Sequence, residues 1–370
     1  MVYRAIGLMS GSSLDGLDIC FAEFQEQAGK WSYELLQADC YSYNDEWTRR
    51  LKNATSLSAL DYLLLHTEYG HHLGQQVNTF IDKYKLHYQV ALITSHGHTT
   101  FHLPAKKMTA QLGDGAAIAA ATQLPVITDL RLLDVALGGQ GAPIVPVGEK
   151  LLMDEYDFFL NLGGIANISM NPDPSSGSEY IAFDVCPANR VLNMLVNELR
   201  KEYDDGGQIT ATGTIDSTLL EKLNSLPYYK LPFPKSLAND FGTEVIYPMI
   251  KEPGIETQHA LRTYTEHIII QIKKAITVLK NDKPQTINYK LLATGGGALN
   301  TFLIQELTKR LKQLDVDVIV PDKNLVNFKE ALIMAFIGVL RWRQEFNVLS
   351  SVTGAERNNI GGALWTGQEA

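Results

Sequence analysis

Glycine and serine gather in three short turns, each beside an apolar, strand-like run. The turns read GLMSGSSLDGLD at 7–18, NLGGIAN at 161–167 and TGGG at 294–297. Glycine lets a backbone approach a phosphate closely, and serine adds a hydroxyl donor without bulk. The turns are therefore candidate anion-binding sites, although a turn that only reverses the chain has a similar composition. The third matches neither the P-loop nor the GxGxxG pattern.

Asp184 follows the apolar run 180–183, and a predicted helix begins at Pro187. A carboxylate at the end of a strand can be aimed into a cleft, where it can act as a general base. The alternative is a capping role at the N-terminus of the helix, a position where aspartate is favoured. The sequence alone leaves both interpretations open.

Three histidines, His96, His98 and His102, follow the buried run 90–94. This run resembles an interior parallel strand, whose carboxyl end is where open α/β sheets place ligand-binding groups. No carboxylate or cysteine joins the histidines at a metal-ligand spacing. A polar loop facing a substrate is therefore favoured over a metal site.

Arg131 and Glu330 are two further candidates for ligand binding. The planar guanidinium of Arg131 suits a carboxylate or a phosphate, and an ion pair with Asp129 or Asp134 is the alternative. Glu330 lies in the apolar stripe of a helix predicted over 327–346. A favourable contact with the helix dipole is the alternative there.

The elements that must position these residues fall into two similar halves. Strand-like patterns at 4–10, 17–21 and 31–43 open the first half, and a strand–glycine–strand unit at 158–169 opens the second. A weak internal repeat of this kind is typical of a duplicated fold that holds one ligand from both sides. The pattern restarts near residue 150, which predicts a boundary between two lobes.

Composition and charge limit the function classes. The 370 residues are 45% hydrophobic, enough to bury a large core, and the net charge of −9 with no basic run argues against nucleic-acid binding. Three scattered cysteines predict neither a disulfide framework nor a zinc site. The sequence shows no signal-peptide pattern and no apolar run of membrane-spanning length. We therefore expect a cytoplasmic protein that does not enter membranes.

Nine blocks, in family order over nearly the whole chain, together resemble the anhydro-N-acetylmuramic acid kinase family of the sugar kinase, heat-shock ATPase and actin superfamily. They are residues 7–18, SHGHT at 95–99, QLGDG at 111–115, DLR at 129–131 with GGQGAP at 138–143, NLGGIAN at 161–167, FD at 183–184 with PAN at 187–189, PKS at 234–236, TGGG at 294–297 and EA at 330–331. Each block alone is common, but the combination is highly specific.

The resemblance implies a two-lobed, ribonuclease H-like α/β fold, with a central mixed sheet in each lobe and an active-site cleft between the lobes. The N-terminal lobe would comprise 1–145 and 345–370, and the C-terminal lobe 146–344. Asp184 would be the catalytic base, with His96, Arg131 and Glu330 around the sugar. The ATP-binding residues would be Gly11, Ser12, Ser13, Leu14, Asp15, Gly16, Leu17, Asp18, Asn161, Gly163, Gly164, Gly295, Gly296 and Gly297.

The implied cofactors are ATP and Mg²⁺, whose ligands are unassigned, with Asp15, Asp18 and Asp184 as candidates. In the family reaction, water opens the 1,6-anhydro bridge and O6 takes the γ-phosphoryl group, giving N-acetylmuramic acid 6-phosphate and ADP for peptidoglycan recycling. The implied partners are the small-molecule sugar, ATP and a second copy in a homodimer. Val185 and Cys186 follow Asp184 where the family usually has Thr-Gly. A non-catalytic ATP-dependent clamp, a degenerate paralogue and a kinase for another sugar are the alternatives.

Overall fold

The computed structural model describes residues 1–11, 14–171, 179–233, 235–238, 240–252, 254–280 and 288–367. These residues form two compact units: unit 1 is Met1–Met153 with Phe328–Ala370, and unit 2 is Asp154–Asn327. The lobes expected from the sequence divide at 146 and 345 instead, so the two divisions place most of helix α12 (Lys323–Trp342) differently. No helix within the described ranges is long and apolar enough to cross a membrane.

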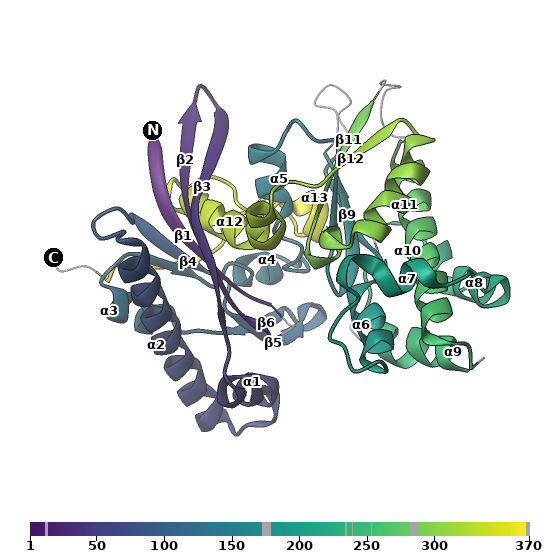
Figure 1. The fold of residues 1–370 in the computed structure, drawn as a ribbon. Coiled ribbons are helices and arrows are strands. Elements are labelled where there is room, and N and C mark those ends of the chain that lie inside the picture. The colour runs from purple at the N-terminus through teal and green to yellow at the C-terminus, as the bar shows by residue number, and fades with distance from the viewer. Residues whose placement is uncertain are drawn as a thin grey trace. The chain divides into compact units, whose positions relative to one another are not determined.

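Unit 1 is built on a six-stranded mixed sheet with the order β13-β7-β4-β1-β2-β3 (Figure 1). The consecutive strands β1, β2 and β3 are antiparallel, whereas β4 runs parallel to β1 and β7 runs parallel to β4. The strands, including the separate β5–β6 pair, are β1 (Val2–Ser10), β2 (Gly16–Gln27), β3 (Lys30–Ser42), β4 (Leu92–Ser95), β5 (His98–Leu103), β6 (Met108–Leu112), β7 (Val126–Thr128) and β13 (Ala363–Trp365). The α-helices, besides α12, are α1 (Asp45–Lys52), α2 (Ala59–Tyr84), α3 (Gly115–Thr122), α4 (Leu132–Ala136), α5 (Pro146–Leu152) and α13 (Ser350–Thr353).

Helices cover both faces of this sheet. Neighbouring residues of β1 point to opposite faces, and residues 5–8 are all buried, so each face packs against a layer of the fold. Gly7 lets α12 approach one face closely, since a Cβ there would collide with the carbonyl oxygen of Ala331 and lie 2.6 Å from the amide nitrogen of Ala335. On the same face the rings of Phe24 and Phe336 lie 5.3 Å apart. Helix α2 covers the opposite face with Leu65, Tyr69, Leu73, Val77 and Phe80.

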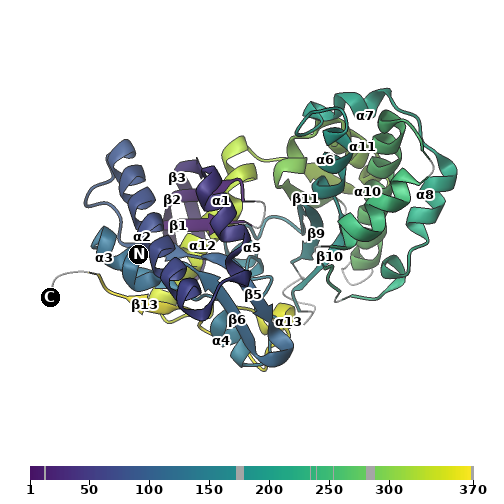
Figure 2. The same ribbon diagram turned by 90° about the horizontal axis from the view of Figure 1, so that it is seen from below.

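Unit 2 contains a five-stranded mixed sheet with the order β10-β9-β8-β11-β12. Its strands are β8 (Phe158–Leu162), β9 (Ile165–Met170), β10 (Ile181–Pro187), β11 (Tyr289–Thr294) and β12 (Val316–Ile319). Its α-helices are α6 (Asn189–Asn197), α7 (Gln208–Thr212), α8 (Ser217–Asn224), α9 (Tyr247–Lys251), α10 (Thr257–Lys280) and α11 (Thr301–Lys312). Apolar side chains of α6, α8, α10 and α11 form one buried cluster with the strands. Figure 2 shows the ribbons of these helices beside β9, β10 and β11.

The two sheets share one plan. In each, three consecutive antiparallel strands are followed by two strands parallel to the first, so β3-β2-β1-β4-β7 in unit 1 corresponds to β10-β9-β8-β11-β12 in unit 2. The internal repeat and the α/β class with a mixed sheet in each half are therefore confirmed.

Candidate active site

The first glycine turn is the tip of the β1–β2 hairpin. Ser10 pairs with Leu17, so residues 11–16 form the tip. Ser12 and Ser13 lie outside the described residues. Of the other tip residues, Gly11 and Leu14 are half-buried, Asp15 is exposed and Gly16 is buried.

Two of the predicted ATP-binding residues in this hairpin have packing roles. A Cβ at Gly16 would lie 2.8 Å from the carbonyl oxygen of Tyr41, and Leu17 is 1% exposed within the apolar core. The requirement for glycine at position 16 thus follows from the neighbouring strand. Packing thus explains Gly16 and Leu17, and the other tip residues remain the candidates for contact with a nucleotide.

Carboxylates lie close together beside this hairpin. The pKa of Asp18 is raised to about 6, mainly by burial; a hydrogen bond with Cys40 offsets part of this rise, and the charges of Asp15 and Glu330 add to it. Burial also raises the pKa of Glu330. Helix α12 begins at Lys323, so Glu330 is beyond its first turn, and the helix-dipole interpretation is wrong. The structure instead places Glu330 beside the hairpin acids.

Arg131 is a buried cation held by neutral groups. Its Nε donates to the carbonyl oxygen of Gly141 at 2.6 Å, one terminal nitrogen donates to the Thr99 hydroxyl at 3.0 Å, and the His102 ring lies 3.3 Å from the other. Burial lowers the pKa of Arg131 to about 10, which leaves it protonated at neutral pH. A buried charge needs a partner, so this arrangement favours an anionic ligand.

The ion-pair interpretation of Arg131 is wrong for the part of the chain that the structure describes. Asp134 accepts hydrogen bonds from the Gly141 amide at 2.7 Å and from the Thr353 hydroxyl at 2.8 Å. Asp129 accepts from its neighbour Thr128. Neither carboxylate pairs with the guanidinium among the described residues.

His96 lies next to Arg131 and is a neutral hydrogen-bonding group. Burial, with the charge of Arg131 adding to it, lowers the pKa of His96 to about 4. Its Nδ1 lies 3.0 Å from the carbonyl oxygen of Gly97, so the neutral ring donates there and keeps Nε2 as an acceptor. His98 already belongs to β5, so the expected polar loop over 95–102 is in part a strand.

A network that the sequence did not predict supports the end of β1. The Tyr43 hydroxyl donates to the Ser10 hydroxyl at 2.9 Å, and Nδ1 of His98 lies 3.3 Å from the same oxygen. Tyr69 continues the network from Tyr43. Ser10 and His98 are part of recognisable blocks, but nothing local in the sequence marks Tyr43.

In unit 2 two of the predicted site residues, Asp184 and Asn161, belong to one polar row across the sheet. Asp184 pairs with Asn167 on β9, Asn167 pairs with Asn161 on β8, and Asn161 pairs with Thr294 on β11. The next row is apolar and contains Phe183, Ile168, Leu160 and Ala293. Because rows alternate between faces, the polar row lies on the face opposite the helical core.

Asp184 lies inside β10 and not at its end. A β-bulge separates Asp184 from Cys186, the strand continues to Pro187, and Ala188 is the N-cap of α6. The strand-end prediction and the helix-cap alternative are therefore both wrong. A β-bulge changes the direction of the side chains next to it, and the half-buried carboxylate of Asp184 lies directly before this bulge.

The segment 235–237 holds Asp184 from the side. The Leu237 amide donates to Oδ2 at 2.9 Å, and the Asp184 amide donates to the carbonyl oxygen of Lys235 at 3.1 Å. The Tyr228 hydroxyl donates to the Asp184 carbonyl at 2.6 Å. Burial raises the pKa of Asp184, and the Leu237 hydrogen bond offsets part of this shift. Oδ1 accepts no hydrogen bond from the described residues, which leaves it available to a ligand.

The second and third glycine turns meet at Asn189. The Asn189 side chain donates to the Leu162 carbonyl at 2.8 Å, and its Oδ1 would lie 2.9 Å from a Cβ at Gly297. Gly295 has φ +78°, and a Cβ there would collide with Asn161. Asn189 was not predicted as a site residue, although it stands in the PAN block that follows Asp184.

Three other glycines in these turns have room for a Cβ, which would make only ordinary van der Waals contacts with the described residues. A Cβ at Gly163 would come no closer than 3.5 Å to a neighbouring atom, and at Gly164 or Gly296 no closer than 3.8 Å. Packing within the protein therefore does not require glycine at these positions. Without a side chain at these positions, a ligand could approach the backbone closely.

Each unit thus gathers part of the predicted site. Unit 1 places Asp18 near Asp15 and Glu330 and, separately, His96 near Arg131, and unit 2 contains Asp184 and the other two glycine turns. Within the described ranges, no group of three or more His, Cys, Asp or Glu side chains could hold a metal ion.

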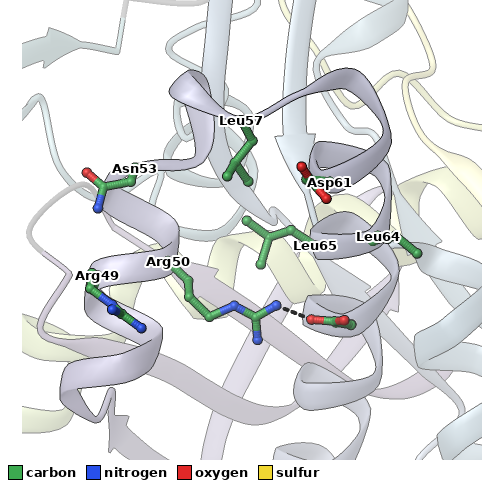
Figure 3. A pocket seen from close by; sticks show the side chains of 8 residues that line it. Arg49, Arg50, Asn53, Leu57, Asp61, Leu64 and Leu65 are labelled. Atoms are coloured by element: carbon green, nitrogen blue, oxygen red, sulfur yellow. Dashed lines mark hydrogen bonds and ion pairs between the residues drawn. The ribbon is translucent and has the colours of Figure 1, made fainter.

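A separate pocket of about 420 Å³ between α1 and α2 is lined by Arg49, Arg50, Asn53, Leu57, Asp61, Leu64, Leu65 and Glu68, none of them a predicted site residue (Figure 3).

The family model and the curated relatives identify one family. A family model described as anhydro-N-acetylmuramic acid kinase matches residues 3–367. The anhydro-N-acetylmuramic acid kinase of Francisella tularensis subsp. novicida is 31% identical over 97% of both chains, and that of Synechococcus elongatus is 34% identical over 95% of this chain and 96% of its own. A solved structure of the activator of the 2-hydroxyisocaproyl-CoA dehydratase from Clostridium difficile with bound ADPNP is 13% identical, covers 92% of this chain and 97% of its own, and has a TM-score of 0.43.

With the duplicated sheet, these relatives define the protein as a two-unit α/β kinase. The chain belongs to the anhydro-N-acetylmuramic acid kinase family.

Proposed function

We propose that the chain uses ATP to open 1,6-anhydro-N-acetylmuramic acid and to phosphorylate O6, giving N-acetylmuramic acid 6-phosphate and ADP. One observation carries this proposal: relatives named for this substrate match the chain over nearly its whole length. The further parts of the proposal are a role in peptidoglycan recycling, a cytoplasmic location, Mg²⁺ as the metal and a homodimeric state.

Asp184 is the proposed general base. Its carboxylate accepts a proton from the water that adds to C1, the bond from C1 to O6 breaks, and O6 forms a bond to the γ-phosphorus as ADP leaves. Oδ1, which accepts no hydrogen bond from the described residues, and the raised pKa of Asp184 support this role, because a base of higher pKa takes up a proton more readily. The Leu237 amide holds Oδ2, so the carboxylate has a fixed orientation.

The glycine turns are the proposed ATP-binding elements. The loose surroundings of Gly163, Gly164 and Gly296 support this role, since packing does not explain the glycines and their backbone amides can approach a phosphate without a side chain between. In unit 1 the described hairpin residues Gly11, Leu14 and Asp15 are proposed to contact the phosphates. Mg²⁺, when bound, would neutralise charge on the phosphates, and the carboxylates of Asp15 and Asp18 are of the type it prefers.

Arg131 is the proposed anchor for the carboxylate of the sugar. It is a buried cation whose hydrogen-bond partners are all neutral, and the substrate is an acid. A planar guanidinium binds a carboxylate through two parallel hydrogen bonds. His96, with an acceptor at Nε2, and Glu330 are proposed to bind polar groups of the sugar.

The test is ADP release measured with 1,6-anhydro-N-acetylmuramic acid, ATP and Mg²⁺, with glucose and N-acetylglucosamine as comparison sugars. We expect release that depends on the anhydro sugar alone. Asp184→Asn should abolish turnover and leave ATP binding intact, because the amide keeps the shape of the side chain and loses the base. Equal release with glucose, or full turnover by the Asp184→Asn variant, would contradict the proposal.

A further inference from the structure

Asp134 is a fully buried carboxylate that is not among the residues assigned to the site. It is 0% exposed and lies in α4, three residues after Arg131. Its Oδ1 accepts from the Thr353 hydroxyl at 2.8 Å and from the Asn359 amide at 3.0 Å, and its Oδ2 accepts from the Gly141 amide at 2.7 Å. Burial of a carboxylate is costly, and these hydrogen bonds offset that cost.

Asp134 contacts the glycine loop 138–143 through both its backbone carbonyl and its carboxylate. The Gly139 amide donates to the Asp134 carbonyl at 2.9 Å, and a Cβ at Gly139 would collide with Oδ2 of Asp134. From the other side, the Gln140 amide donates to the Thr353 carbonyl at 2.7 Å. The loop is therefore fixed between α4 and the C-terminal helix α13.

This loop carries the carbonyl that orients Arg131. The Gly141 amide binds Asp134 at 2.7 Å, and the Gly141 carbonyl accepts from Nε of Arg131 at 2.6 Å. One residue thus joins the buried carboxylate to the guanidinium. A shift of the Gly141 backbone would move the acceptor that sets the direction of the guanidinium plane.

We infer that Asp134 is a positioning residue, which holds the loop 138–143 and through it the guanidinium of Arg131 in the orientation that binds the acidic sugar. This inference rests on the proposed function, because it takes Arg131 as the sugar anchor. It assigns to Thr353 and Asn359 a supporting part, since both donate to Asp134.

Asp134→Asn tests the inference in the full-length protein. The amide nitrogen of asparagine cannot accept the hydrogen bonds that one carboxylate oxygen accepts, so the loop loses part of its support. We expect the KM for the anhydro sugar to rise about tenfold or more, with the KM for ATP and kcat nearly unchanged, because Arg131 binds the ground state and the transition state alike. Thr353→Val, which removes one donor to Asp134, should give a smaller rise in the same KM.

Glu266→Gln is the matched control. Glu266 is also a buried carboxylate, 3% exposed, but it pairs with Arg262 and Arg310 in unit 2. The Glu266→Gln substitution should lower the thermal midpoint and leave the KM for the anhydro sugar unchanged. If Asp134→Asn and Thr353→Val likewise lower only the thermal midpoint, Asp134 is merely structural and the inference is wrong.

Arg131→Met separates this inference from the proposed function. A large rise in sugar KM with Arg131→Met, and none with the Asp134 and Thr353 variants, overturns the inference alone. If Arg131→Met leaves the sugar KM unchanged, the assignment of Arg131 as anchor falls as well. In support of the inference, Asp134→Asn should add little to the effect of Arg131→Met, because both act on one interaction.

Discussion

Replacing Gly164 by alanine should weaken ATP binding without weakening the fold. A Cβ at Gly164 would lie 3.8 Å from the Cβ and Nε of Arg190, an ordinary contact with a flexible side chain, and φ of Gly164 is outside the left-handed region. Alanine at such a site is neutral or stabilises by about 0.4–1 kcal/mol, because it restricts the unfolded chain. The thermal midpoint should therefore stay constant or rise.

The expected effect of Gly164→Ala is weaker binding of the nucleotide. If the turn approaches a phosphate, the added methyl group displaces at least one hydrogen bond to a charged acceptor, worth about 1.5–3 kcal/mol. This corresponds to a rise of about 10- to 140-fold in the KM for ATP, since about 1.4 kcal/mol is a factor of ten. Steady-state ADP release at saturating sugar measures that KM, and differential scanning fluorimetry measures the thermal midpoint.

Gly297→Ala is the matched control in the third glycine turn. A Cβ there would lie 2.8 Å from Cβ of Leu162 and 2.9 Å from Oδ1 of Asn189, so it overpacks the protein itself. We expect a loss of about 1–3 kcal/mol in the free energy of unfolding, equivalent to about 2–4 °C in midpoint per kcal/mol. An unchanged KM for ATP with Gly164→Ala would refute the assignment of this turn to the nucleotide. An unchanged midpoint with Gly297→Ala would refute the packing argument.

The remaining predictions concern titration and buried polar contacts. Because burial raises the pKa of Asp184 and catalysis needs its ionised form, kcat should fall with decreasing pH at a midpoint above the ordinary aspartate value of 3.8, and a pH–rate profile with a lower midpoint would contradict this. Tyr228→Phe removes the 2.6 Å hydrogen bond to the Asp184 carbonyl, so we expect a loss of about 1 kcal/mol in urea unfolding and a fall in kcat at constant KM for ATP; an unchanged kcat would exclude a role for Tyr228 in placing Asp184. Lys329→Met breaks the buried ion pair with Glu149 at 2.7 Å and should cost about 3–5 kcal/mol in the same assay, whereas a loss below about 1 kcal/mol would show that the pair is dispensable. Burial lowers the pKa of His96 to about 4 and of His267 to about 3, below the unfolded value of 6.5, so both histidines should make stability fall as pH decreases from about 6.5, whereas the raised pKa of Asp18 acts in the opposite sense; the thermal midpoint of His267→Asn should therefore fall less over this range than that of the unsubstituted protein, and an equal or steeper fall would contradict the sign.

The sequence predicted the elements whose signals are local. Strand–glycine–strand patterns located the β1–β2 and β8–β9 hairpins, and the run 90–94 located β4 to within two residues. These features depend on side-chain alternation and on glycine, which are visible within about ten neighbouring positions.

The environment of the predicted base was not accessible in this way. Asp184 is held by Leu237 and Tyr228, which are more than forty positions away in the sequence, and the bulge before Cys186 has no glycine to mark it. The local sequence pattern therefore predicted that the strand ends at Asp184, whereas β10 continues to Pro187, and it left a helix-capping role for Asp184 as an alternative. Likewise, Asn189 bridges turns that lie on both sides of it in the sequence, and only the folded chain brings these turns together.

The duplicated sheet explains why the repeat predicted the backbone better than the chemistry. In both hairpins the second pair from the tip is equivalent: Met9 with Asp18 in unit 1, and Asn161 with Asn167 in unit 2. The third strand completes each row with Cys40 and with Asp184, respectively. The acid therefore stands on the second strand of one unit and on the third strand of the other. Strand pairing depends on backbone hydrogen bonds and on alternation, which tolerate such exchanges, so a duplicated fold can keep one plan while its two halves diverge in chemistry.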